Sequence, residues 1–312
     1  MLLLWGAVHG VAAQRVALRQ YPRDLIVKSE IGYKAGLVER LARPPQLVFI
    51  GGSRCERFDP AYARRKTGLR TVNLATTNSH PEGAWAFAKW LLERSPRTRL
   101  RWVWGINSTA LDDRALDPAL LQDPRFSWYF NDALLRSQRK LLPHSDAQMP
   151  TRSRLDGRRY SRHGLLTWNP YDRYFQRGGT LSASLRKYVA KAFAKRPLPG
   201  GGAIGGTRAS RYFEKTLKLL NRHGTTPVIV IMPVQPAVQA LLRVQGWNRG
   251  YEHLLVYLHG LSARYRFRVV DVSRVSSFGG DPGGFYDGVH ITRANSDKVI
   301  DTLVAQAGDA LR

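Results

Sequence analysis

The sequence predicts an α/β fold, in which a parallel sheet of about five strands is flanked by helices and interrupted by one inserted basic and aromatic segment. Two observations predict it. Short, nearly continuous apolar runs recur along the chain, as expected of strands buried on both faces. Stretches with helical patterning alternate with these runs, which indicates a three-layer arrangement with helices on both faces of the sheet.

The predicted strands are apolar runs of four to six residues. They are Gln46–Ile50, Thr71–Leu74, Leu100–Trp104, Pro227–Met232 and Phe267–Val272. The predicted helices are Pro81–Arg94, Arg208–Arg222, Ala237–Gln245, Tyr251–Tyr265 and Thr292–Leu311. The first helix follows Ser79-His80-Pro81-Glu82, which fits a capping box with proline in the first turn.

One segment, from about Leu111 to Gly206, breaks this alternation. It is rich in arginine and aromatic residues and contains no clear strand of the sheet. We expect an insertion between the third and fourth strands that forms a cap or rim over a site, with a flexible loop at Pro197–Gly206. Its aromatic side chains could stack on sugar rings or could belong to the core.

The chain has 312 residues and a net charge of +26, from 49 basic and 23 acidic residues. Such a charge attracts polyanions: nucleic acid, anionic lipid surfaces or acidic envelope polymers. The densest basic stretch, Thr151 to Arg196, has twelve Lys or Arg against two Asp. No recognition helix, zinc spacing or RNA-binding motif accompanies it, so nucleic acid is not favoured. An arginine-rich solvated surface and an acidic cell-surface partner both remain open.

The N-terminal part, residues 1–45, is expected to form a helix outside the main domain at residues 46–312. Met1–Ala13 is apolar but shorter than the roughly 20 residues that span a bilayer, and no basic segment precedes it. It fits the remnant of a signal or anchor helix, which indicates an extracytoplasmic protein that is anchored or secreted. An ordinary helix packed on the domain is the alternative. The single cysteine, Cys55, excludes an intrachain disulfide.

Residues with the chemistry of a nucleophile, a base and an orienting acid follow the predicted strands. Gly51-Gly52-Ser53-Arg54 directly follows the first strand and presents a serine hydroxyl on a tight turn. Asp287-Gly288-Val289-His290 precedes the last helix. A serine hydroxyl needs a base, and an aspartate near a histidine can orient the imidazole. Asn78 and Asn107 follow other strands and could supply donors to an oxyanion.

Four sequence blocks resemble the GDSL/SGNH hydrolase superfamily, in its divergent envelope-associated branch that includes the D-alanine-transfer protein of teichoic acid synthesis and the alginate acetylation proteins. The blocks are Phe49–Arg54 (FIGGSR), Val72–Glu82 (VNLATTNSHPE), Trp104–Asn107 (WGIN) and Phe285–Thr292 (FYDGVHIT). The resemblance covers roughly Gln46–Ala110 and Thr226–Leu311. It implies a three-layer, flavodoxin-like sheet.

The resemblance implies Ser53 as nucleophile, His290 as base and Asp287 as its orienter, with oxyanion donors from the Ser53 backbone, Asn78 and Asn107. The chain departs from the family pattern in the second block, which usually carries glycine where Ala75 or Asn78 stands here. The expected function is a serine-dependent acyl esterase or O-acyltransferase acting on a cell-envelope carbohydrate or related polymer. A non-catalytic glycan-binding or envelope assembly protein is the alternative.

Other residues near the motifs allow two interpretations each. Arg54 could contact an anionic substrate or pair with a surface acid such as Glu56, and His80 could line the pocket or belong to the turn before a helix. Cys55 is expected to be a small buried residue. We expect no cofactor and no metal, since His253 and His259 are six residues apart rather than four and no phosphate-binding loop is present. The expected partners are an acylated carbohydrate or anionic envelope polymer and a membrane-bound acyl-donor protein.

Overall fold

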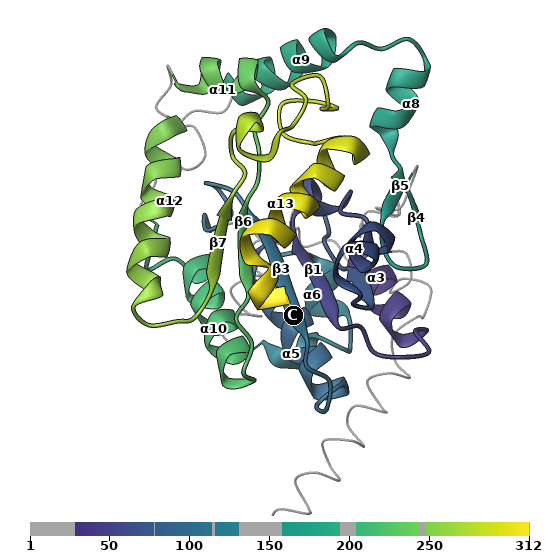
Figure 1. Cartoon of the computed structure of the whole chain (residues 1–312), viewed down its shortest axis with the longest axis vertical. Coiled ribbons are helices and arrows are strands. Elements are labelled where there is room, and N and C mark those ends of the chain that lie inside the picture. Colours follow the sequence, from purple (N-terminus) through teal and green to yellow (C-terminus); the bar gives the residue numbers. More distant parts are fainter. Residues whose placement is uncertain are drawn as a thin grey trace, which may run out of the picture.

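The computed structural model describes residues 29–77, 79–113, 116–130, 158–193, 204–243 and 247–311. One sheet of five parallel strands runs through the middle of the molecule, with helices on both faces (Figure 1). The strands are β1 (Leu47–Gly51), β2 (Thr71–Asn73), β3 (Arg101–Ile106), β6 (Val228–Ile231) and β7 (Arg268–Asp271). Their order across the sheet is β2-β1-β3-β6-β7, and every neighbouring pair is parallel. The predicted α/β class and all five predicted strands are confirmed.

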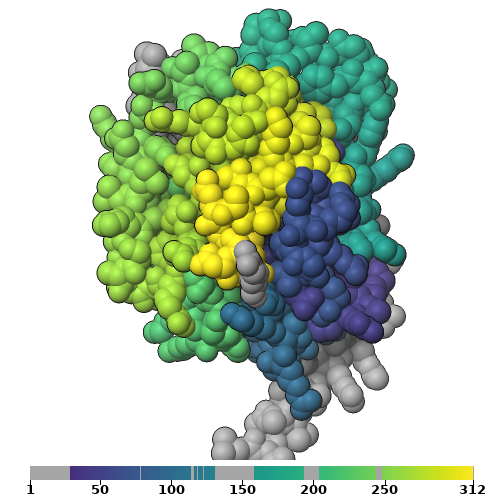
Figure 2. Space-filling model, in the orientation of Figure 1, coloured from purple at the N-terminus to yellow at the C-terminus, as the bar shows by residue number. Residues whose placement is uncertain are grey.

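Strands β1, β3 and β6 contribute alternate side chains to two separate apolar cores, because successive residues of a strand point to opposite faces. Val48, Ile50 and Trp104 pack on one face with the helices α3 (Glu30–Glu39), α5 (Pro81–Arg94), α10 (Arg208–Arg222) and α12 (Trp247–Ser262). Phe49 and Val103 pack on the other face with α4 (Pro60–Thr67) and α13 (Arg293–Leu311). Figure 2 shows α4 and α13 side by side on that second face.

The helices predicted between the strands are confirmed, and α5 and α10 have the predicted bounds. Helix α11 is Pro236–Arg243, and short 3-10 turns occur at η1 (Ser53–Cys55), η2 (Ser127–Tyr129) and η3 (Val275–Phe278). The capping box at Ser79 is wrong. The N-cap of α5 is His80 rather than Ser79, and its side chain makes no cap bond. The Glu82 carboxylate accepts from Arg208 of α10 instead. Glu82 is buried, and a buried carboxylate without a charged partner costs more free energy than an uncapped N–H at a helix end.

In its described residues the inserted segment adds no strand to the main sheet, but it contains a small sheet that the sequence did not predict. Strands β4 (Arg159–Tyr160) and β5 (Leu166–Trp168) pair antiparallel. The segment also contains α6 (Pro118–Gln122), α8 (Pro170–Gln176) and α9 (Leu181–Phe193), and α9 lies beside α11 at one end of the molecule (Figure 1). Most of the loop predicted at Pro197–Gly206 lies outside the described residues.

The N-terminal helix α3 packs into the fold through buried side chains such as Ile31 and Ala35. The predicted signal or anchor segment at Met1–Ala13 lies outside the described residues. Among the helices that the structure describes, none combines the length and the apolar character that crossing a bilayer requires.

Candidate active site

Ser53 follows the carboxyl end of β1, on a sharp turn. The turn requires glycine at two facing positions, Gly51 on β1 and Gly105 on β3. Gly51 has φ +132°, and a Cβ there would lie 2.4 Å from the Gly105 carbonyl oxygen of β3. A Cβ on Gly105 would in turn lie 1.9 Å from Cys55 Sγ. The two glycines are paired in the sheet register, so the chain can turn sharply into η1 with Ser53 at its first position.

His290 reaches Ser53 from the loop between β7 and α13. The loop is closed by a bridge between Phe285 and Ile291 and by a 2.8 Å bond from the Tyr286 N–H to the His290 carbonyl. The Ser53 Oγ lies 2.8 Å from His290 Nε2, and His290 Nδ1 lies 2.8 Å from Asp287 Oδ2. A carboxylate beside Nδ1 fixes the proton there, which leaves Nε2 to accept from the serine hydroxyl.

Asp287 is only 3% exposed and is surrounded by donors. Its Oδ1 accepts from the backbone N–H groups of Val289 and His290, and its Oδ2 accepts from Tyr171 in addition to His290. Burial by itself raises the pKa of the carboxyl, but the bonds and the charge of His290 and the other donors outweigh it, so the pKa of Asp287 lies well below its usual range. Asp287 is therefore ionised and can stabilise a protonated imidazole.

The inserted segment supplies a residue to this site that the sequence did not identify. The Tyr171 hydroxyl of α8 donates to Asp287, and its ring stacks on Tyr286 and lies against the His290 ring. Burial, and then the Asp287 charge, raises the pKa of Tyr171, so its hydroxyl stays a donor. The sequence around Tyr171, Asn169-Pro170-Tyr171-Asp172, is a capping box. It indicates that a helix starts there, but not that this helix lies next to Asp287.

Helix α8 is held in place by charged groups. Asn169 caps it, and Asp172 completes the capping box. The Asp172 carboxylate also accepts from Arg57 and, at 3.0 Å, from the Tyr286 hydroxyl. Because Arg57 lies close to Ser53 in the sequence and Tyr286 close to His290, these bonds join the inserted helix directly to the candidate site.

Asn107 lies at the carboxyl end of β3 and lines a small cavity of about 90 Å³ together with Ser53 and His80. Its Oδ1 accepts from both the Thr109 N–H and the Thr109 hydroxyl, each at 2.8 Å. The remaining side of the amide is its NH₂ group, a donor. β1 and β3 are also the strands between which the chain order reverses, and such a point is where ligands bind in open parallel sheets.

A second hollow of about 210 Å³ opens on the other side of Ser53. It is lined by the serine and His290 and by aromatic, amide and basic residues, among them Tyr171, Tyr286, Asn169, Arg54, Arg57 and Arg158. Arg54 lines both hollows. The serine hydroxyl therefore stands between one small polar cavity and one larger basic and aromatic cavity.

A cluster of buried charges supports the turn that carries Ser53. Glu56 was expected as a surface acid, which is wrong: it is 2% exposed, pairs with Arg158 and accepts from Thr77. Glu30 of α3 pairs with the same arginine. Lys34 beside them donates to backbone carbonyls, and burial lowers its pKa to about 8. Sequence patterns do not reveal such a cluster, because charged residues are mostly exposed.

The remaining predicted residues are placed as follows. Cys55 is buried as expected, and burial raises the pKa of its thiol to about 12, so it is a poor nucleophile. His80 lines the cavity with Asn107 and stands at the start of α5.

Asn78 lies outside the described residues. Within the part of the chain that is described, no three His, Cys, Asp or Glu side chains are grouped to hold a metal.

Comparison with known proteins finds no matching family model and no matching curated sequence.

Proposed function

We propose that this protein is a serine-dependent acyl esterase or O-acyltransferase that acts on a cell-envelope carbohydrate or a related polymer. The observation that carries the proposal is the continuous hydrogen-bonded chain from Ser53 Oγ through the His290 imidazole to the buried Asp287 carboxylate. Nucleophile, base and orienting acid in this geometry are the parts that acyl transfer through a serine requires.

In the proposed reaction, Ser53 Oγ attacks the acyl carbonyl carbon while its proton passes to His290 Nε2. The tetrahedral intermediate then loses the alcohol, which takes the proton from His290. Water or a sugar hydroxyl next gives a proton to His290 and attacks the acyl-serine ester. When this second intermediate collapses, the proton returns to Ser53. Asp287 stays ionised throughout and stabilises the imidazolium.

The oxyanion of each intermediate needs donors that are already in place. The proposed donors are the Ser53 backbone N–H and the Asn107 amide, because Asn107 shares a cavity with Ser53 and its Oδ1 is already occupied by Thr109. Asn78 remains a proposed third donor from the resemblance. The small cavity would then hold the acyl carbonyl, and its size favours a short acyl group.

The finer assignment to the GDSL/SGNH superfamily is part of the proposal. Numbered within the sheet alone, the strand order is 2-1-3-4-5, the flavodoxin-like order. The four blocks of the resemblance include Ser53, Asn107 and the Asp287–His290 loop. The larger hollow, with three arginines and two tyrosines, suits an anionic or ring-bearing acceptor, and the net charge of +26 suits an anionic polymer. An extracytoplasmic location and a membrane-bound acyl-donor partner remain parts of the same proposal.

Hydrolysis of p-nitrophenyl acetate by the wild type, Ser53→Ala and Ser79→Ala tests the nucleophile. Ser79 is the matched control, because it lines the same cavity and no bond joins it to His290 among those that the structure describes. We expect Ser53→Ala to lose activity by about 10⁶-fold in kcat, to background, and Ser79→Ala to stay within about tenfold of the wild type. Equal activity of all three proteins would overturn the assignment of Ser53.

A binding-only role is the second candidate, and one observation favours it: Tyr171 and Tyr286 stack on each other beside the larger hollow, as in sites that hold sugar rings. Glycan binding can be compared between Ser53→Ala and Tyr286→Ala by calorimetry. A binding-only protein keeps full affinity in Ser53→Ala, and its wild type shows no turnover of any ester. Turnover that depends on Ser53 excludes this candidate.

A further inference from the structure

A second cleft lies at the opposite edge of the sheet from Ser53. It is formed where β3, β6 and β7 begin, whereas Ser53 and Asn107 follow the ends of β1 and β3. Because all five strands are parallel, these are opposite edges. The cleft has a volume of about 370 Å³, and the proposed acyl-transfer chemistry does not involve it.

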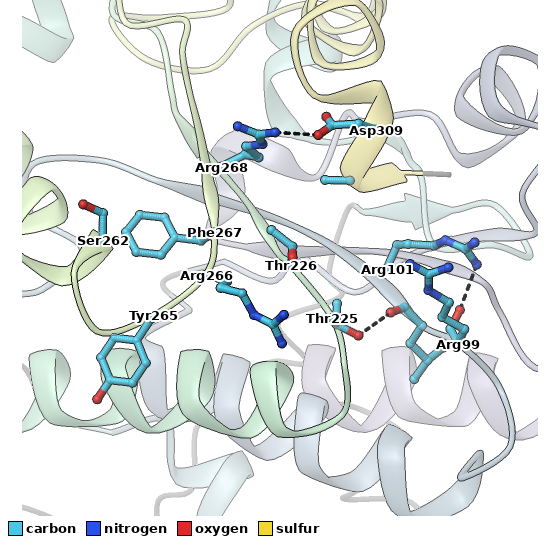
Figure 3. A pocket seen from close by; sticks show the side chains of 12 residues that line it. Arg99, Arg101, Thr225, Thr226, Ser262, Tyr265, Arg266, Phe267, Arg268 and Asp309 are labelled. Atoms are coloured by element: carbon cyan, nitrogen blue, oxygen red, sulfur yellow. Dashed lines mark hydrogen bonds and ion pairs between the residues drawn. The ribbon is translucent and has the colours of Figure 1, made fainter.

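Among the described residues, four arginines and one carboxylate line this cleft. Figure 3 shows Arg99 and Arg101 beside each other, with Arg266 extending toward them from the start of β7. Arg268 pairs with Asp309 at 2.6 Å. The cleft therefore gathers like charges from two separate segments of the chain, residues 99–101 and 266–268.

The arginines of the cleft differ in their partners. The Arg101 guanidinium donates to the Arg99 carbonyl oxygen at 3.0 Å, and burial together with the neighbouring Arg99 charge lowers the pKa of Arg101. Within the described residues, no carboxylate pairs with the Arg99 or the Arg266 guanidinium. Two guanidinium groups thus face one cleft with their donors available for a ligand.

The other walls of the cleft are polar on one side and aromatic on the other. Thr225 donates to the Leu100 carbonyl at 3.0 Å, which leaves its oxygen to accept, and the Thr226 side chain lies beside it (Figure 3). Tyr265 and Phe267 form the aromatic wall. Such a cleft offers two charged forks for anionic groups and an apolar surface for the remainder of a ligand.

We propose that this cleft binds a ligand that carries two neighbouring phosphate groups, one held by Arg99 and the other by Arg266. A guanidinium presents its N–H donors as a planar fork that matches phosphate oxygens, and a phosphate group carries more negative charge than a carboxylate. Two phosphates would supply the negative charge that the Arg99 and Arg266 guanidinium groups lack among the described residues. The ligand is either a small diphosphate compound or two adjacent groups of a phosphate polymer.

Calorimetric titration of the full chain with inorganic pyrophosphate and with long-chain polyphosphate tests this site. The test variant is Arg99→Gln/Arg266→Gln. The matched control is Arg186→Gln/Arg243→Gln. It removes the same net charge, but from α9 and α11, and neither residue lines the cleft. All four arginines are exposed, so the fold should tolerate both pairs. Far-UV circular dichroism checks this.

The cleft variant should bind about tenfold or more weakly than the wild type, since each lost charge-assisted bond weakens binding by about that factor, while the control keeps its affinity. Loss of pyrophosphate binding in the cleft variant indicates the small ligand, and loss of polyphosphate binding alone indicates the polymer. Asp309→Asn should tighten binding by releasing Arg268. Equal affinities of the two double variants would show general attraction to net charge, and would overturn the site, as would no binding of either probe by the wild type.

Discussion

Both edges of the sheet are rich in polar side chains, but the charged groups at the two edges differ in whether they have partners within the chain. At the carboxyl edge, Asp287 is held by His290, by Tyr171 and by two backbone N–H groups, so its charge is balanced within the chain. At the amino edge, Arg99 and Arg266 have no carboxylate partner among the described residues. Internal partners fix the geometry that chemistry requires, whereas open partners leave charge to be balanced by a ligand. The predictions below test this contrast.

After the loss expected for Ser53→Ala, the largest effect at the carboxyl edge is expected from Asp287→Asn. An amide in place of the carboxylate would donate to Nδ1 and favour the tautomer with the proton on Nε2, so His290 could no longer accept from Ser53. We expect kcat for ester hydrolysis to fall by about 10⁴-fold. Asp301→Asn on α13, which changes a carboxylate that contacts only Lys66 and Tyr62 among the bonds described, is the control. Activity within about tenfold of wild type in Asp287→Asn would contradict the role of the carboxylate.

A smaller effect is expected from Asn107→Ala. Loss of an oxyanion donor lowers kcat by about 10² to 10³-fold and leaves KM nearly unchanged, because the bond forms fully only in the transition state. Thr109→Val is the control, since it removes one donor to Asn107 Oδ1 but leaves the asparagine amide. A raised KM with unchanged kcat would instead mean that Asn107 only binds substrate.

The low pKa of Asp287 predicts how stability depends on pH. The folded protein binds the proton of the Asp287 carboxyl less tightly than the unfolded chain does, in which the pKa has its ordinary value of 3.8. The ionised carboxylate therefore stabilises the fold above pH 3.8, and this stabilisation is lost as the pH falls below that value. Urea unfolding should show the wild type about 2 kcal/mol more stable than Asp287→Asn near pH 6, with the difference narrowing below pH 3.8. A difference that does not change with pH would argue against the shifted carboxyl.

Tyr171→Phe tests whether the inserted helix positions the site. The ring can still stack on Tyr286, but the hydroxyl donor to Asp287 is lost. We expect kcat/KM to fall by about tenfold, and the acid limb of its pH profile to move to higher pH, because the less stabilised carboxylate holds the imidazolium proton more strongly. Tyr174→Phe, on the same helix, should leave the profile unchanged. A purely structural role for Tyr171 would lower activity without moving the profile.

No effect on ester hydrolysis is expected from Arg99→Gln/Arg266→Gln at the amino edge. These arginines line a cleft on the far side of the sheet from Ser53, so kcat and KM for p-nitrophenyl acetate should match the wild type. Steady-state kinetics with and without pyrophosphate measures this. If the variant lost most of its esterase activity while the wild type kept it, the arginines of the amino edge would belong to the same functional site as Ser53. The contrast between the two edges would then be wrong.

The sequence predicted the sheet and the residues at its carboxyl edge, because both depend on local patterns. Apolar runs located the strands, and the rule that strand ends share an edge placed Ser53 with Asn107. The Tyr171 contact to Asp287 could not be predicted, since it depends on where a long insertion folds back. Neither could the burial of Lys34 and Glu30, which also needs partners distant in the chain, such as the Asn73 carbonyl and Arg158.

The most direct test of the central claim is covalent labelling with a fluorophosphonate, followed by mass-spectrometric mapping of the modified residue. The account predicts one label per chain on Ser53, little or no label in His290→Ala, and unchanged labelling in Ser79→Ala. His290→Ala removes the base while leaving the serine in place, so its loss of labelling would link the two residues in one reaction. A label on another residue, or equal labelling of Ser53 without His290, would contradict the proposed site.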